Sequence, residues 1–126
     1  MGAIVGVGID VVEVGRVARA YARFGDRFLQ RVFTPAERDY CLARYDVAHG
    51  LAGRFAAKEA VFKALSPARP TRVNWQEIAI ASDGDAPRVE LSGAAAGWAD
   101  ALGVGRIHVS ISHERTLAVA LAVAEK

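Results

Sequence analysis

The segment from Gly50 to Leu65 constrains the fold most, because two opposite faces of it are both suited to packing. On a helical projection at about 100° per residue, large apolar side chains form one stripe and small side chains form the opposite face. The stripe contains Leu51, Phe55, Phe62 and Leu65, and the small face contains Ala52, Gly53, Ala56, Ala57, Ala60 and Ala64. Small residues let another backbone approach closely, so we expect this helix to lie between two layers of structure.

The rest of the chain predicts strands and helices in the order β-α-α-α-β-β-α-β-β. This order favours a single α+β domain over residues 1–126, with helices packed on one side of a small, mostly antiparallel sheet. The predicted elements are a strand over Ile4–Val12, a helix over Glu13–Arg31 interrupted or bent at Gly25-Asp26, a helix that follows a Thr34-Pro35-Ala36-Glu37 capping box to about Tyr45, the helix over Gly50–Leu65, strands over Trp75–Ser82 and Arg88–Leu91 joined by a turn at Asp83-Gly84-Asp85, a helix over Ser92–Leu102, and a closing hairpin of Ile107–Ile111 with Leu117–Ala124.

The use of cysteine indicates the compartment. Cys41 is the one cysteine among 126 residues, which rules out an internal disulfide and fits a reducing environment such as the cytoplasm. No apolar run approaches the ~20 residues that a membrane span needs. We therefore expect a cytoplasmic protein without a membrane segment.

Three ionisable side chains border the apolar stripe of the central helix. Lys58 falls within the stripe, and Glu59 lies beside it with Lys63 at i+4. In one interpretation Glu59 and Lys63 form a surface ion pair, and Lys58 extends to water. In the other, Glu59 binds a metal ion while the two lysines neutralise phosphate. The spacing alone is compatible with both.

Four motifs in order along the chain are similar to those of one enzyme family. This set resembles the holo-acyl-carrier-protein synthase group of the 4′-phosphopantetheinyl transferase superfamily. The resemblance implies the 4′-phosphopantetheinyl transferase fold. It also implies a Mg²⁺-dependent enzyme of fatty acid biosynthesis. Such an enzyme transfers 4′-phosphopantetheine from coenzyme A to a serine of an acidic apo acyl carrier protein and releases 3′,5′-ADP. The resemblance also implies a homotrimer with active sites between neighbouring subunits. The motifs are Gly8-Ile9-Asp10, Phe33-Thr34-Pro35-Ala36-Glu37, Gly53-Arg54-Phe55-Ala56-Ala57-Lys58-Glu59-Ala60 with Lys63, and His108-Val109-Ser110-Ile111-Ser112-His113.

The resemblance further implies roles for single residues. Asp10 and Glu59 match the carboxylates that bind Mg²⁺, and Lys63 matches the lysine beside the reacting phosphate. These three are the expected catalytic residues, with Glu59 the candidate acceptor of the serine proton. The loop of residues 66–74 departs from the family, because it lacks the glycine-rich stretch that members often carry there, and the adenine contacts stay open. The expected contacts to coenzyme A are Arg54, Lys58, Ser112 and His113.

Five arginines follow one another at helical spacing early in the chain. Such a basic face speeds association with an acidic helix, and family analogy selects Arg16 and Arg23 as the contacts to the carrier protein. The alternative is a solvated face that serves solubility. No nucleic-acid-binding motif accompanies the arginines, so we expect no nucleic acid partner. The five residues are Arg16, Arg19, Arg23, Arg27 and Arg31.

Two other functions use the same residues. A different Mg²⁺-dependent transferase or hydrolase of a nucleotide pyrophosphate would also need Asp10, Glu59 and Lys63. A scaffold module that binds acidic helices would need only the arginines. The sequence also leaves open whether a fatty-acid or a polyketide carrier is the partner.

Overall fold

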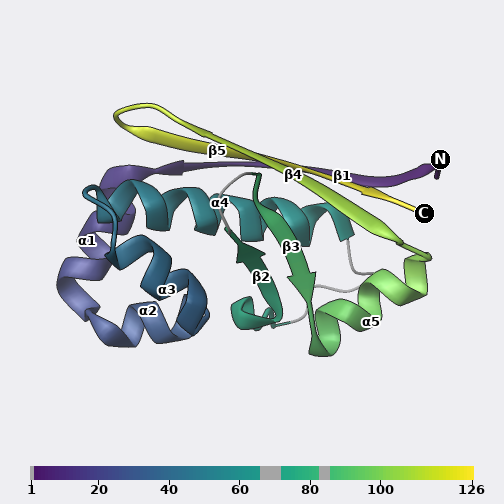
Figure 1. The fold of residues 1–126 in the computed structure, drawn as a ribbon, viewed down its shortest axis with the longest axis horizontal. Helices are drawn as coiled ribbons and strands as arrows, with labels where there is room; N and C mark the ends of the chain where they lie inside the picture. The colour runs from purple at the N-terminus through teal and green to yellow at the C-terminus, as the bar shows by residue number, and fades with distance from the viewer. Residues whose placement is uncertain (1, 66–71, 83–85) are drawn as a thin grey trace.

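Helix α4 (Val47–Leu65) runs through the middle of the molecule, with a sheet on one side and shorter elements on the other (Figure 1). The computed structural model describes residues 2–65, 72–82 and 86–126. Alanines of α4 pack against the sheet, while Leu51 and Leu65 are also fully buried. The prediction that this helix lies between two layers is confirmed.

Strands β1 (Ile4–Glu13), β5 (Leu117–Glu125) and β4 (Arg106–His113) form an antiparallel sheet in the order β1-β5-β4. Leu121 of β5 lies opposite Ile9 on one side and Ser110 on the other. Gly6 and Gly8 bring β1 so close to α4 that a Cβ atom on either would collide with a backbone carbonyl oxygen of the helix. Backbone therefore meets backbone at this contact, as the small face of the helix predicts.

The layer on the other side of α4 has two parts. At one end lie α1 (Val14–Phe24), α2 (Asp26–Val32) and α3 (Pro35–Leu42). The remainder consists of a short 3₁₀ turn η1 (Trp75–Glu77), an antiparallel pair of strands β2 (Ile78–Ala81) and β3 (Arg88–Leu91), and helix α5 (Gly93–Leu102). The molecule is thus α+β with antiparallel strands, which confirms the predicted fold class.

The observed element boundaries differ from the predicted ones by up to about three residues; the helix predicted to about Tyr45, for example, ends at Leu42. Gly25, with a φ of 56°, separates α1 from α2, so the predicted interruption of the first helix is confirmed as a full break. Helix α4 begins at Val47, before the predicted start at Gly50. Trp75 opens a 3₁₀ turn and not a strand, because its ring packs edge-on against Phe55 and Phe62 of α4. The predicted turn at 83–85 and most of the 66–74 loop lie outside the described residues.

The outer face of the three-stranded sheet is apolar and open to solvent. Val7, Ile9 and Val11 of β1 are 57%, 58% and 55% exposed, and Leu117 and Leu121 of β5 lie in the same layer. Side chains alternate along a strand, so these residues point away from α4. A contiguous exposed patch of this kind usually marks a contact with another protein surface.

Across the described part of the chain, no helix combines the length and apolar character that crossing a membrane requires.

Candidate active site

Strand β1 and helix α4 bring together Asp10, Glu59 and Lys63, the predicted catalytic residues. The Lys63 ammonium donates to Asp10 Oδ1 at 2.9 Å and to the carbonyl oxygen of Ile9 at 3.0 Å. Burial raises the pKa of Glu59, the nearby Asp10 carboxylate raises it further, and Lys63 opposes the shift. Two carboxylates that repel each other at the edge of a cavity favour a bound cation.

The donor set of this corner fits magnesium. Over residues 2–65, 72–82 and 86–126, no cluster of three or more His, Cys, Asp or Glu side chains is suited to a metal ion. Mg²⁺ prefers hard oxygen ligands and is usually held by one or two carboxylates together with waters and substrate phosphates. Asp10 and Glu59 supply two such carboxylates, so the residues present are compatible with the predicted metal.

A hollow of about 350 Å³ opens beside the two carboxylates. Its lining includes Asp10, Glu59 and the predicted partner contact Arg16, together with the rings of Phe28 and Phe55. Arg16 comes from the first turn of α1, which follows β1 directly. The α1 arginine nearest the carboxylates therefore faces the same opening.

The basic stripe is divided between two helices. Arg16, Arg19 and Arg23 lie on α1, and Arg27 with Arg31 lies on α2 beyond the break at Gly25. Arg16 and Arg23 are seven residues apart, which places them on one side of α1. The two residues predicted to contact the carrier protein thus share a surface that leads to the Asp10 and Glu59 hollow.

Lys58 lies in a different environment from Lys63. Its side chain is fully buried, and its ammonium lies 2.7 Å from Glu37 Oε1, 2.8 Å from Trp75 O and 2.9 Å from Ile78 O. The interpretation in which Lys58 extends to water is wrong, because the β2 layer covers it. Burial lowers the pKa of Lys58, and the Glu37 carboxylate opposes that shift. All three donors have oxygen partners, so a phosphate would have to displace one of them.

Glu37 is the partner that sequence reasoning did not find. The predicted capping box is present, with Thr34 N donating to Glu37 Oε1 at 2.8 Å and Glu37 N donating to Thr34 Oγ1 at 3.2 Å. The same carboxylate accepts from Ile80 N through Oε2 at 2.6 Å and pairs with Lys58. The capping motif predicted the start of the helix. It did not predict that the Glu37 carboxylate also pairs with Lys58.

Arg54 lies on the far side of α4 from Glu59. Its guanidinium donates to Ser82 Oγ at 2.5 Å and stacks 4.3 Å from the centre of the Tyr40 ring. Five residues correspond to about 140° around an α-helix, which separates the Arg54 and Glu59 side chains. Arg54 Nε is buried and has no hydrogen-bond partner among the described residues.

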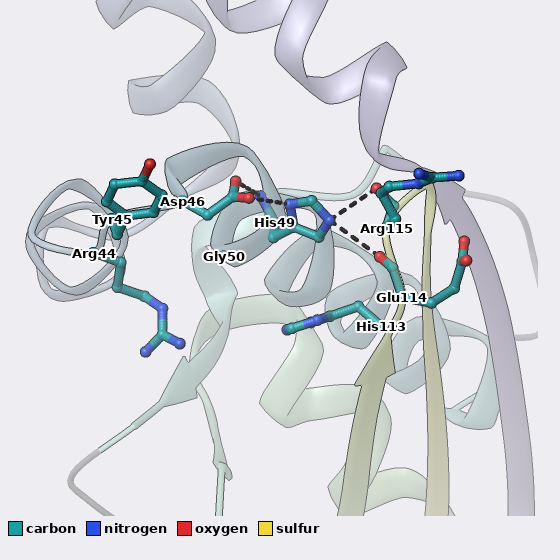
Figure 2. A pocket seen from close by; sticks show the side chains of 8 residues that line it. All are labelled: Arg44, Tyr45, Asp46, His49, Gly50, His113, Glu114 and Arg115. Carbon is teal, nitrogen blue, oxygen red and sulfur yellow. Dashed lines mark hydrogen bonds and ion pairs between the residues drawn. The ribbon is translucent and has the colours of Figure 1, made fainter.

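His113 lines a second pocket, of about 520 Å³, at the opposite edge of the sheet (Figure 2). Cationic and anionic groups surround it, and sequence reasoning missed most of them. Arg44 and Arg115 offer charge for a phosphate group, and His49 packs edge-on against His113 with ring centres 5.6 Å apart. The full lining is Arg44, Tyr45, Asp46, His49, Gly50, His113, Glu114 and Arg115.

Ser112 does not join either group within one chain. It precedes His113 on β4, and its side chain lies on the outer face of the sheet while Ile111 packs toward the core. Six of the seven residues predicted for catalysis and coenzyme A therefore fall into three places, and Lys58 lies in a fourth, buried beneath β2. Asp10, Glu59 and Lys63 lie beside β1, Arg54 and His113 lie on the other side of α4, and Ser112 lies on the exposed sheet face.

Comparison with known proteins identifies the family. The model of the 4′-phosphopantetheinyl transferase superfamily matches residues 6–122. A holo-[acyl-carrier-protein] synthase of Anaeromyxobacter dehalogenans is 47% identical over 125 residues, which cover 97% of this chain and 96% of that protein. One of Chlamydia trachomatis is 43% identical over 120 residues, covering 95% and 98%.

Solved structures agree with the sequence matches. The holo-[acyl-carrier-protein] synthase of Neisseria meningitidis superposes with a TM-score of 0.87 at 34% identity, covering 98% of this chain and 100% of that one. The Helicobacter pylori synthase in complex with coenzyme A gives 0.80 at 31% identity, covering 94% and 98%. The resemblance carried by the four motifs is confirmed: this chain belongs to the 4′-phosphopantetheinyl transferase superfamily, within its holo-acyl-carrier-protein synthase group.

Proposed function

We propose that this chain transfers the 4′-phosphopantetheine group of coenzyme A to a serine of an apo acyl carrier protein, and that it requires Mg²⁺. The serine oxygen forms a bond to the β-phosphorus, the bond from that phosphorus to 3′,5′-ADP breaks, and 3′,5′-ADP leaves. The observation that carries this proposal is the convergence of Asp10, Glu59 and Lys63 beside one hollow, in a member of this family.

Asp10 and Glu59 would hold the metal through carboxylate oxygens. When bound, Mg²⁺ would withdraw charge from the pyrophosphate of coenzyme A. Lys63 lies close enough to Asp10 to share this corner, and its ammonium offsets negative charge that develops on the phosphate. Glu59 is the candidate acceptor of the serine proton, because its carboxylate lines the hollow that the carrier serine would enter.

The remaining site residues act on coenzyme A. His113, with Arg44 beside it, offers positive charge to a phosphate in the second pocket, and Arg54 offers its buried Nε donor. Lys58 has its donors engaged, so we assign it to the position of α4 relative to β2 unless a phosphate displaces one partner. Ser112 would reach coenzyme A only across a contact between two chains.

Assembly of several copies would complete the site. Asp10 lies on β1 and His113 on β4, the two outer strands of the sheet, with β5 between them and α4 filling the space beneath. The apolar outer face of the sheet supports a contact between copies that sets the β1 side of one against the β4 side of the next. A contact between unlike surfaces forms a ring when the rotation between neighbouring copies divides a full turn, and we propose the ring of three copies, the homotrimer of the family.

The carrier protein would bind on the α1 side. Arg16 lines the hollow that holds the two carboxylates, and Arg23 lies on the same side of the helix. An acidic carrier helix docked there would present its serine to the metal site. We place the reaction in the cytoplasm, where the single cysteine stays reduced, and in fatty acid biosynthesis.

The test is the intact mass of a purified apo carrier protein after incubation with this protein, coenzyme A and Mg²⁺. We expect the carrier to gain the mass of one phosphopantetheine group, and both EDTA and Glu59→Ala to abolish the gain. Glu90→Gln, which changes an exposed carboxylate on β3, is the matched control and should retain activity. Release of 3′,5′-ADP without a carrier would instead support a pyrophosphate hydrolase, and carrier binding without any mass gain would support a scaffold.

A further inference from the structure

His49 fastens the turn between β4 and β5 to the start of α4 (Figure 2). Its Nε2 lies 3.0 Å from the carbonyl oxygen of Glu114 and 2.9 Å from that of Arg115. Its Nδ1 lies 2.6 Å from Oδ2 of Asp46, whose other carboxylate oxygen accepts the His49 backbone N–H at 3.1 Å. One imidazole ring therefore connects three oxygen atoms from two segments that are far apart in the sequence.

The three oxygen atoms that lie within 3.0 Å of the His49 ring nitrogens, two carbonyl oxygens and one carboxylate oxygen, can only accept hydrogen bonds. A neutral imidazole has one N–H donor and one lone pair, so it would turn a lone pair toward an oxygen on one side. The imidazolium carries a proton on both nitrogens: Nε2 donates toward the two carbonyl oxygens, and Nδ1 forms an ion pair with the Asp46 carboxylate, although this contact does not have hydrogen-bond geometry. The Asp46 carboxylate raises the pKa of His49, and burial of the ring opposes this shift.

The surrounding charges leave Asp46 as the direct counterion. The Glu114 carboxylate is engaged with Thr116, accepting from its N at 2.8 Å and its Oγ1 at 2.5 Å. The other charged or titratable side chains that line the pocket are Arg44 and Tyr45 from the connection before α4, His113 from β4 and Arg115 from the turn itself. Arg44, His113 and Arg115 carry or can carry positive charge, so protonation of His49 adds to a basic pocket.

The fastened turn controls two parts of the proposed site. His113 is the last residue of β4, directly before the turn, and its ring packs against the ring of His49. On the other side, Thr116 O accepts the backbone N–H of Val14, the first residue of α1, at 2.9 Å. Movement of the turn would displace His113 first and could reach the helix that carries Arg16.

We propose that His49 is a positioning residue: as an imidazolium, it locks the β4–β5 turn and so places His113 for contact with coenzyme A. The part that concerns coenzyme A rests on the proposed function, whereas the lock itself does not. Because protonation is favoured in the folded state, the stabilisation is fully present below the pKa of an unfolded histidine and is lost as the pH rises through the folded pKa.

The lock is tested by NMR titration of the three histidine rings in ¹⁵N-labelled protein, with His49→Gln, His108→Gln and His113→Gln used only to assign the signals. We expect His49 to titrate above the usual range of histidine, and the amides of Glu114, Arg115 and Thr116 to shift with the same midpoint. The proposed lock would be wrong if His49 titrates within or below the usual range of histidine, or if the chemical shifts of the turn amides do not change with its titration. The wild-type titration decides this even if His49→Gln fails to fold.

Steady-state kinetics tests the link to the reaction. His49→Gln should raise KM for coenzyme A about tenfold with little change in kcat, as is typical when a residue that orients a ligand contact is removed. In the wild type, KM should rise with pH as His49 loses its proton, and the variant should lack this rise. A variant with the wild-type KM and pH profile would overturn the positioning role, with Glu90→Gln again the control.

The two proposals can fail separately. If the wild-type protein transfers no phosphopantetheine group, the proposed function fails, while the NMR titration still decides whether His49 locks the turn. If transfer occurs and His49 titrates normally, the further inference alone fails.

Discussion

Two lysines five residues apart on α4 form carboxylate pairs of nearly equal length in opposite environments. Lys58 lies 2.7 Å from Glu37, with the two side chains 0% and 2% exposed. Lys63 lies 2.9 Å from Asp10, with side chains 49% and 15% exposed. The first pair has its remaining hydrogen bonds satisfied by backbone groups, and the second faces a hollow lined by another carboxylate and Arg16.

The difference shows that residue type and spacing do not separate a buried ion pair from one that faces a cavity. The buried pair is held by three segments, so it fixes how α3, α4 and β2 meet. In the proposed function the Lys63–Asp10 pair can exchange its partners for a ligand, because it is open to solvent and faces the hollow. Breaking each pair should therefore affect a different property of the protein.

The largest effect should come from Lys58→Met, which leaves the Glu37 carboxylate buried without its cation. Removal of one partner of a buried pair typically destabilises by about 3–5 kcal/mol. Urea unfolding followed by circular dichroism measures the change. Lys63→Met, the same substitution on the same helix, is the control and should lose no more than about 1 kcal/mol. Equal losses from the two variants would remove the distinction between the pairs.

Lys63→Met should instead lower turnover. Loss of a group that stabilises charge in the transition state typically reduces kcat by about 10²–10³-fold. The measurement is kcat for 3′,5′-ADP release with saturating carrier protein, at a temperature where the variant is fully folded. Normal turnover in this variant would assign Lys63 to structure alone.

Reversal of charge at Arg16 should weaken binding of the carrier protein and leave KM for coenzyme A unchanged. We expect Arg16→Glu to raise KM for the carrier about tenfold at low salt, and the difference from wild type to shrink as salt screens exposed charges. Arg38→Glu on α3 makes the same charge change away from the hollow. If both variants behave alike, net charge and not a docking surface explains the result.

The smallest effect concerns Cys41, which reports opening of the buried region. Burial raises the pKa of its thiol to about 11, so little thiolate exists at neutral pH and alkylation of the folded protein should be slow. Lys58→Met should speed alkylation by iodoacetamide about three- to tenfold through local opening, whereas Lys63→Met should not. Mass spectrometry over time measures both rates. Equal rates would place Cys41 outside the unit that the buried pair holds together.

The sequence was informative where the cause is local. Small residues on one face of the α4 helix predicted close approach of the sheet, and the capping box predicted the start of α3. The partner of Lys58 could not be predicted, because Glu37 reaches it only after α3 and β2 have packed. Likewise, the family resemblance assigned Asp10 and His113 to a site between subunits. Within one chain the strand order β1-β5-β4 puts them on the two outer strands, and local sequence pattern does not predict which distant strands pair.

Gly6 and Gly8 carry a consequence for anyone who ranks positions by evolutionary invariance. A single methyl group at either position would collide with the α4 backbone, so no other amino acid fits at these two positions. Both sit within four residues of Asp10, on the same strand. A ranking by invariance alone would count Gly6 and Gly8 among the catalytic or ligand-binding residues, although what they contribute is the absence of a side chain.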